Sequence, residues 1–162
     1  MFAQLDTKSV YSFMDSVVDL NTYVKRAKEL GYQSIGLMDR DNLYAAYHFA
    51  QLAIRNGLRP LIGTEANLFY EGRKIPFRLL AKNNQGYKNL MKLATELSSG
   101  QREFTYFSDY LNDIALILPS EDWEPGMSLG SEVFIGVRPE DAGKEFDYPV
   151  VPLHTVRYFE NA

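Results

Sequence analysis

The chain contains no cysteine and only two histidines, His48 and His154, among its 162 residues. The absence of cysteine excludes a disulfide framework, a thiol nucleophile and any cysteine-ligated zinc site. Two histidines are also too few for a histidine-rich metal cluster. Cysteine-based sites and histidine-rich metal clusters are therefore excluded before any motif is considered.

The chain also lacks an excess of positive charge. Its 17 Lys and Arg face 21 Asp and Glu, for a net charge of −4. A free-standing nucleic-acid binder usually carries a basic face, because neutralising phosphates drives its affinity, so the bulk charge leaves only a local basic patch open. The N-terminus has no basic segment followed by an apolar one, and no apolar run is long enough for a bilayer. These features predict a soluble cytoplasmic domain with no membrane partner.

What the sequence does have is apolar content and length. Hydrophobic residues make up 46% of the chain. That fraction, over this length, is enough for one domain with a real core, because burial can offset the entropy of ordering the chain. We therefore expect a single folded domain over residues 1–162.

Strand signals alternate with helical spacing along the chain. Helices are expected at 20–30, capped by Asp19, then after a cap at Asn42, and through Tyr87 to Leu97. The inner stripe of the second helix is expected to be Leu43, Ala46, Tyr47, Ala50 and Ile54. Strands are expected at 1–5, 34–38, 60–70, 74–82, 113–118, 132–137 and 148–153, with a hairpin turn at Glu71-Gly72. This order predicts βαβ units, a mostly parallel sheet and functional groups at the carboxyl ends of its strands.

Four stretches in this order resemble one known family. They are QLDTKSVYS at 4–12, GLMDRDNLY at 36–44 with PLIGTE at 60–65, LAKNNQGYKNL at 80–90, and HTVRYF at 154–159. They are similar to the PHP (polymerase and histidinol phosphatase) domain at the start of bacterial DNA polymerase III alpha subunits. The likeness is good over 1–98 and 150–159 and weaker over 100–147.

The resemblance implies a distorted (β/α)7 barrel, related to the TIM barrel, which this short chain could leave incomplete. It also implies a fragment of a much longer subunit that is a DNA-directed DNA polymerase. The palm, fingers and thumb that carry polymerisation are absent from these 162 residues. The fragment itself is therefore not expected to be catalytic.

Active members of the family hold several metal ions, which activate water for phosphoester hydrolysis. The corresponding positions here are Asp6, Lys8, Asp39, Arg40, Glu65, Pro76, Thr155 and Arg157. Only Asp39 and Glu65, with Asp6 as a third candidate, keep ligand chemistry. Lysine and arginine arrive protonated and repel a cation. The resemblance therefore predicts a degenerate metal site with no metal and no other cofactor; a divalent metal is expected only if this interpretation is wrong.

The charges suggest a sharper hypothesis. Side-chain cations would now supply the positive charge that metals once supplied, because buried carboxylates without a partner are costly. The predicted ion-pair network at the barrel mouth joins Lys8, Arg40 and Arg157 to Asp6, Asp39, Asp41 and Glu65. The alternative is that these groups are merely solvated at an open loop end.

Three functions compete. The first, which the missing ligands favour, is a metal-free structural module that supports the rest of the polymerase subunit and docks other replication proteins, meeting DNA through the full-length polymerase. The second is a residual metal-dependent phosphoesterase, either an exonuclease or a pyrophosphatase, which rests on fold resemblance alone. The third is a module that guides DNA, which the acidic balance opposes.

Overall fold

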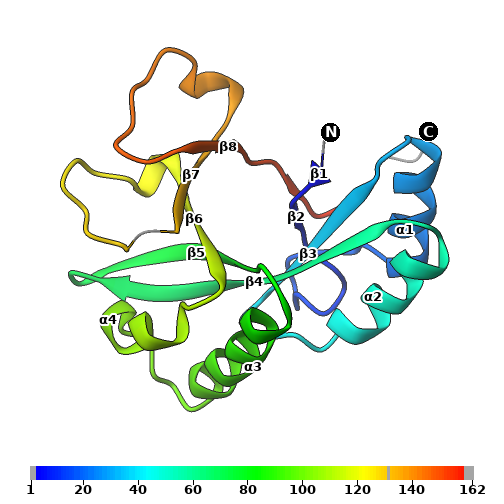
Figure 1. Ribbon diagram of the computed structural model, residues 1–162, viewed down its shortest axis with the longest axis horizontal. Coiled ribbons are helices and arrows are strands. Elements are labelled where there is room, and N and C mark those ends of the chain that lie inside the picture. The colour runs from blue at the N-terminus through cyan, green and yellow to red at the C-terminus, as the bar shows by residue number, and fades with distance from the viewer. Residues whose placement is uncertain (1–2, 131, 159–162) are drawn as a thin grey trace.

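The computed structural model describes residues 3–130 and 132–158, so Met1, Phe2 and Phe159 of the patterns above lie outside it. Its centre is a curled seven-stranded sheet in the order β1-β3-β4-β5-β6-β7-β8 (Figure 1). The strands are β1 (Ala3–Gln4), β3 (Ser34–Arg40), β4 (Arg59–Tyr70), β5 (Arg73–Ala81), β6 (Ile114–Pro119), β7 (Val133–Val137) and β8 (Val150–Pro152). The sheet forms a half-barrel, in agreement with the predicted barrel-type α/β fold.

A separate parallel pair connects the two edges of this sheet. It consists of β2 (Asp6–Thr7), which follows β1 along the chain, and β9 (Thr155–Val156), which follows β8. The backbone N–H of Lys8 extends the pairing by donating to the carbonyl of Val156 at 2.9 Å. The second described strand, β2, therefore pairs with the last one, β9, and residues almost a whole chain length apart become neighbours.

The sheet is parallel except around β5, which is antiparallel to both β4 and β6. The predicted hairpin at Glu71-Gly72 is confirmed, since Tyr70 pairs with Arg73. Both turn residues have left-handed backbone, with φ of 49° and 78°. Glycine adopts this conformation freely, and the sequence of two such residues is typical of a tight hairpin turn.

The helices are α1 (Leu20–Glu29), α2 (Ala46–Arg55), α3 (Asn84–Ser98) and α4 (Phe104–Phe107), with short 3₁₀ turns at Ser108–Tyr110, Ser120–Asp122 and Pro139–Asp141. In Figure 1, α1 and α2 flank β3 and β4, while α3 and α4 lie beneath β4 and β5. One apolar core lies under each helix pair, and a smaller one around Met38, Ile117 and Leu153 lies inside the curl. None of the described helices combines the length and the apolar character needed to cross a membrane.

The ends of the helices test the sequence patterns. Asp19 caps α1 as predicted, since its carboxylate accepts a hydrogen bond from the Thr22 N–H. The second helix is present, but the prediction of its cap was wrong: α2 starts only at Ala46, and Asn42 instead accepts from the Tyr44 N–H within the preceding loop. The buried stripe is Ala46, Phe49 and Ala53, so Tyr47 and Ile54 are exposed. This helix has apolar residues on more than one face, so helical periodicity alone was compatible with both the predicted stripe and the buried stripe that the structure has.

Candidate functional site

A buried lysine occupies the centre of the site. The side chain of Lys8, just after β2, is fully buried. Its Nζ lies 2.6 Å from Asp6 Oδ1 and 3.0 Å from Glu65 Oε2, and it donates to the carbonyl of Met38 at 2.7 Å. The ammonium group therefore bridges two carboxylates that are themselves almost completely buried.

A second buried cation, Arg78, contacts the same two carboxylates. Its Nε lies 3.1 Å from Asp6 Oδ2 and its Nη2 lies 3.3 Å from Glu65 Oε2. The Thr155 hydroxyl donates to Asp6 Oδ2 at 2.6 Å. We call Asp6, Lys8, Glu65 and Arg78 the buried cluster; its two carboxylates each contact both cations.

Sequence reasoning missed Arg78, although a signal for it was present. In an antiparallel hairpin, the turn fixes which residues lie opposite one another. With Glu71-Gly72 as the turn, counting outward from Tyr70 and Arg73 places Arg78 opposite Glu65, and the structure has this pair. The family position two residues earlier, Pro76, contributes only its carbonyl oxygen, which accepts from Arg78 Nη1 at 2.7 Å.

Three further charges extend from the buried cluster to the surface. Arg40, opposite Glu65 in the β3–β4 register, places Nε 2.9 Å from Glu65 Oε1 and Nη2 2.9 Å from Asp15 Oδ2. Arg157 Nε lies 3.0 Å from Asp15 Oδ1, an ion pair without the alignment of a hydrogen bond. Asp15 was not predicted, because it lies in the loop between β2 and α1, which has no periodic pattern.

The carboxylates of Asp39 and Asp41 do not bind the cations that the predicted network assigned to them; each has other close partners. Asp39 precedes Arg40 on β3, so the two side chains point to opposite faces of the strand. Its carboxylate accepts hydrogen bonds from the Ser9 N–H and from the hydroxyls of Ser9 and Ser12, at 2.6–2.7 Å. Asp41 forms its close ion pair with Arg102, at 2.8 Å, and attracts Arg40 only from a longer distance.

The charges of the buried cluster control its protonation. Burial by itself would raise the pKa of Asp6 and of Glu65, but the nearby charges of Lys8 and Arg78 outweigh it and lower both pKa values. Both carboxylates are therefore ionised at neutral pH, and their negative charges are balanced by cations of the same chain.

This balance predicts a loss of stability in acid. The pKa values of Asp6 and Glu65 are lower in the folded chain than their ordinary values of 3.8 and 4.5. The unfolded chain therefore binds more protons in this range, and the unfolding free energy must decrease as the pH falls from about 4.5 through the folded pKa values. Urea unfolding midpoints between pH 7 and pH 3 measure the decrease. The variant Glu65→Gln should give a shallower slope over this range, and an unchanged slope would show that Glu65 is not one of its sources.

The donor groups present do not fit a multi-metal centre. Over residues 3–130 and 132–158, no three His, Cys, Asp or Glu side chains are grouped in a way that could hold a metal ion. The two carboxylates of the buried cluster already contact the ammonium of Lys8 and the guanidinium of Arg78. A metal ion between Asp6 and Glu65 would meet these cations at close range and be repelled.

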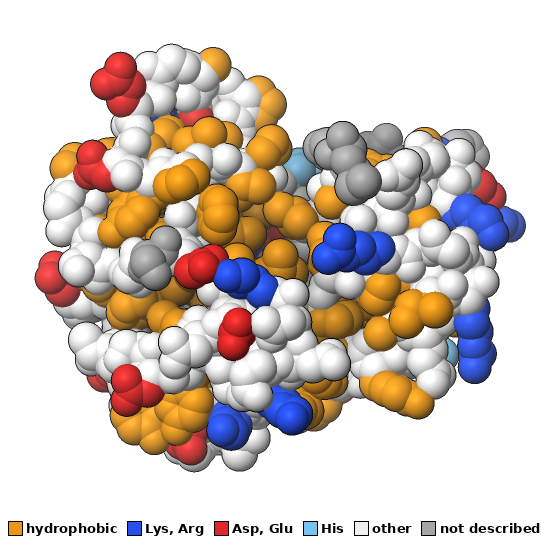
Figure 2. Space-filling model, in the orientation of Figure 1, with side chains coloured by type: hydrophobic (Ala, Val, Ile, Leu, Met, Phe, Trp, Pro, Cys, Tyr) orange, Lys and Arg blue, Asp and Glu red, His pale blue; other side chains and the backbone are white. Residues whose placement is uncertain are grey.

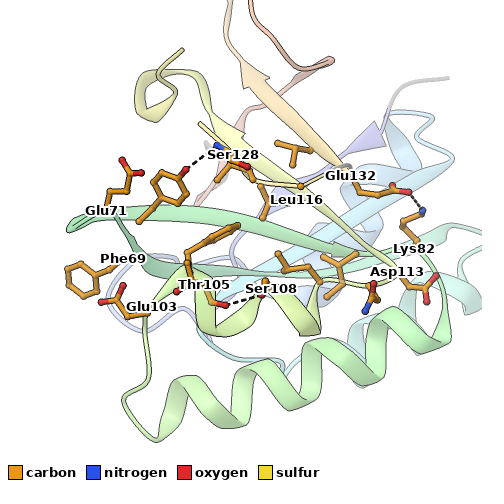
Figure 3. A pocket seen from close by; sticks show the side chains of 18 residues that line it. Phe69, Glu71, Lys82, Glu103, Thr105, Ser108, Asp113, Leu116, Ser128 and Glu132 are labelled. Atoms are coloured by element: carbon orange, nitrogen blue, oxygen red, sulfur yellow. Dashed lines mark hydrogen bonds and ion pairs between the residues drawn. The ribbon is translucent and has the colours of Figure 1, made fainter. Parts of the chain in front are cut away.

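A separate cavity of about 680 Å³ is lined by residues of α4, β6 and the β4–β5 turn (Figure 3). Its rim carries the carboxylates of Glu71, Glu103, Asp113 and Glu132. The one lysine of this lining, Lys82, is already 2.7 Å from Glu132, as the dashed line in Figure 3 shows. A phosphoester would be repelled by this rim, so the cavity does not resemble a site for nucleotides or nucleic acid.

Comparisons with known proteins identify a matching family and individual relatives by sequence. The PHP domain family matches residues 4–124. DNA polymerase III subunit alpha of Streptococcus pyogenes serotype M1 is 47% identical over 161 residues, which are 98% of this chain and 16% of that protein. The Bacillus subtilis (strain 168) protein of the same name is 33% identical over 126 residues, 74% of this chain and 11% of the relative. This chain therefore spans only a small part of the length of such relatives.

Solved structures show likeness of fold. An amidohydrolase from Chromobacterium violaceum, solved with bound sulfate and no metal, gives a TM-score of 0.50 at 18% identity and covers 60% of this chain and 34% of its own. A two-domain protein from Bacteroides vulgatus, described as containing a predicted PHP-like metal-dependent phosphoesterase, also gives 0.50, at 15% identity, over 75% of this chain and 35% of its own. At these identities the likeness extends to the fold alone.

Proposed function

This chain belongs to the PHP domain family, and from that premise we propose that it is a metal-free structural module of a DNA polymerase III alpha subunit. In this role it forms one domain over residues 1–162, stabilises the longer cytoplasmic polymerase subunit and offers docking surfaces to that subunit and to other replication proteins. It meets DNA through the full-length polymerase. The identity to alpha subunits, over 98% of this chain in one of them, supports the polymerase context.

The observation that carries the metal-free part of the proposal is the position of Lys8. Its ammonium lies between Asp6 and Glu65, the two carboxylates at degenerate ligand positions that belong to the buried cluster. Buried carboxylates need a positive partner, and a cation of the chain supplies one without any requirement for metal. The charges of Arg40 and Arg157 at two further degenerate positions support the same interpretation.

The second candidate is a metal-dependent phosphoesterase, which is favoured by the structural likeness to the Bacteroides vulgatus protein with a predicted PHP-like phosphoesterase. It would need a divalent metal held by Asp6, Asp39 and Glu65, but Lys8 stands in this place and Asp39 points away from the other two. A DNA-guiding module is supported less. In the view of Figure 2, the Lys and Arg side chains stand apart among other groups and form no continuous basic face.

Metal content tests the proposal directly. After dialysis against zinc or manganese and removal of free metal, the chain should retain well below one equivalent, because Lys8 and Arg78 repel a cation at the carboxylates. It should also show no manganese-dependent hydrolysis of a generic phosphodiester. Elemental analysis and a chromogenic diester assay give the two readouts. Near-stoichiometric metal that is lost in Glu65→Gln and Asp39→Asn variants would refute the metal-free proposal.

A further inference from the structure

The loop between β2 and α1 exposes an unusual number of large apolar side chains. Phe13 is 87% exposed, Met14 94% and Val17 75%, and Val10 and Tyr11 are each about half exposed. Tyr44, 80% exposed, joins them from the connection after β3, where Asn42 links the two segments by donating to the Tyr11 carbonyl. We call these side chains the loop patch: Val10, Tyr11, Phe13, Met14, Val17 and Tyr44.

Hydrogen bonds hold this loop against the body of the domain. The hydroxyl of Ser16 lies 2.6 Å from the carbonyl oxygen of Lys8 and 2.9 Å from that of Arg157. The Val17 N–H donates to the Arg157 carbonyl at 3.0 Å, and the Val10 N–H donates to that of Val18 at 3.1 Å. The polar groups of the loop therefore bond to the domain, while its apolar side chains remain outside.

The charged groups of the site anchor the same loop. The carboxylate of Asp15 lies between Arg40 and Arg157, and the hydroxyl of Ser12 donates to Asp39. Met14 adopts left-handed backbone, with φ of 61°, which non-glycine residues seldom do. A strained, heavily bonded loop is ordered before any partner arrives, so a partner that binds it does not have to supply that ordering.

The size of the loop patch matches an interaction surface. At about 150–200 Å² for a fully exposed residue of this kind, the six exposed fractions correspond to a total of about 650–870 Å². The largest apolar patch of a typical monomer is about 300–600 Å², and one side of a standard protein interface buries about 800 Å². The loop patch therefore has the area expected of an interface.

We propose that the loop patch docks onto the remainder of the polymerase subunit, against an apolar surface bordered by carboxylates. This inference rests on the proposed function. In the Streptococcus pyogenes relative, the matched region is 16% of the protein, so most of the subunit is available as the occupant. Because both partners belong to one chain, a high effective concentration lets the area of a single loop suffice.

Charge and composition identify the chemistry of that surface. The side chains of Arg40 and Arg157 are 40% and 41% exposed beside the patch, whereas Asp15 between them is 19% exposed. The outward charge is thus positive and complements an acidic border. Met14, Val10 and Val17 cannot stack on bases as aromatic rings do, so an apolar protein surface suits the patch better than single-stranded nucleic acid.

The test is a double variant, Phe13→Ser with Met14→Asn, made in the full-length subunit and in the 162-residue chain. Asparagine suits position 14 because it tolerates left-handed backbone. The full-length variant should show a lower Tm for its first transition and several-fold faster limited proteolysis at the junction that follows this domain. The 162-residue variant should keep its Tm, since both side chains are almost fully exposed. The control Tyr47→Ser, at an exposed position on α2, should change neither protein.

Four outcomes would overturn the inference. An unchanged full-length subunit would show that the patch is not docked on it, and an equal loss of Tm in the 162-residue chain would assign the effect to the domain itself. A 162-residue dimer that the variant converts to a monomer would make a second copy the occupant. If the 162-residue chain and its Tyr47→Ser control bound single-stranded DNA but the double variant did not, the patch would be a stacking surface. The metal measurement above is independent, so the metal-free proposal can fail while docking holds, and the reverse.

Discussion

Replacing Lys8 by methionine is expected to destabilise the chain by about 3–5 kcal/mol, the loss typical of removing one partner from a buried ion pair. Methionine fills similar volume but carries no charge. Asp6 loses its 2.6 Å partner, Glu65 loses its 3.0 Å partner, and the carbonyl of Met38 loses its donor. Arg78 alone would then face both carboxylates in the buried cluster. Urea unfolding at pH 7 measures the change.

A matched lysine on the surface provides the control. Lys82 also forms a 2.7 Å ion pair, with Glu132, but the two side chains are 42% and 50% exposed. Water and salt screen such pairs, so Lys82→Met should change stability by less than about 1 kcal/mol. The combination of Lys8→Met with Glu65→Gln should recover part of the loss, because it removes one of the uncompensated charges. If Lys8→Met and Lys82→Met were equally mild, the buried cluster would not be a stabilising network.

The second large effect is expected at Gly36 on β3. A Cβ added there would lie 2.2 Å from the carbonyl oxygen of Leu5 and 2.8 Å from its carbonyl carbon. Both atoms belong to the backbone, so the segment that joins β1 to β2 would have to move, and Asp6 would move with it. Gly36→Ala should therefore cost about 3 kcal/mol or more, at the upper end for overpacking. Thermal unfolding of the chain is the measurement.

A substitution at Gly143 serves as the control, because it tests the cost of left-handed backbone without any steric clash. A Cβ there would meet no atom within 4 Å, although its φ of 85° is left-handed. Gly143→Ala should cost only about 1–2 kcal/mol, the usual penalty for an L-residue in that conformation. Equal losses at the two glycines would mean that contact with Leu5 is not the cause.

Local features of the site followed from local rules. The turn at Glu71-Gly72 was recognised from its residue types, and the register that it sets already implied the Glu65–Arg78 pair. The alternation of side chains along β3 likewise separates Asp39 from Arg40. Both conclusions could have been reached from the sequence. The family motif positions, used alone, instead predicted Pro76 as a site residue and placed Asp39 in the same ion-pair network as Arg40.

The sequence by itself determined helices α1, α2 and α3, the hairpin, most strands and the family, because periodicity, caps and turn chemistry act over a few residues. Only the tertiary structure decided which groups from distant segments of the chain meet. The Thr155 hydroxyl reaches Asp6 across 149 positions, since β9 pairs with β2 at the closure of the curled sheet. Asp15 joins Arg40 and Arg157 because an aperiodic loop folds back onto both. Such pairings depend on how the whole sheet curls, and no short stretch of sequence contains that information.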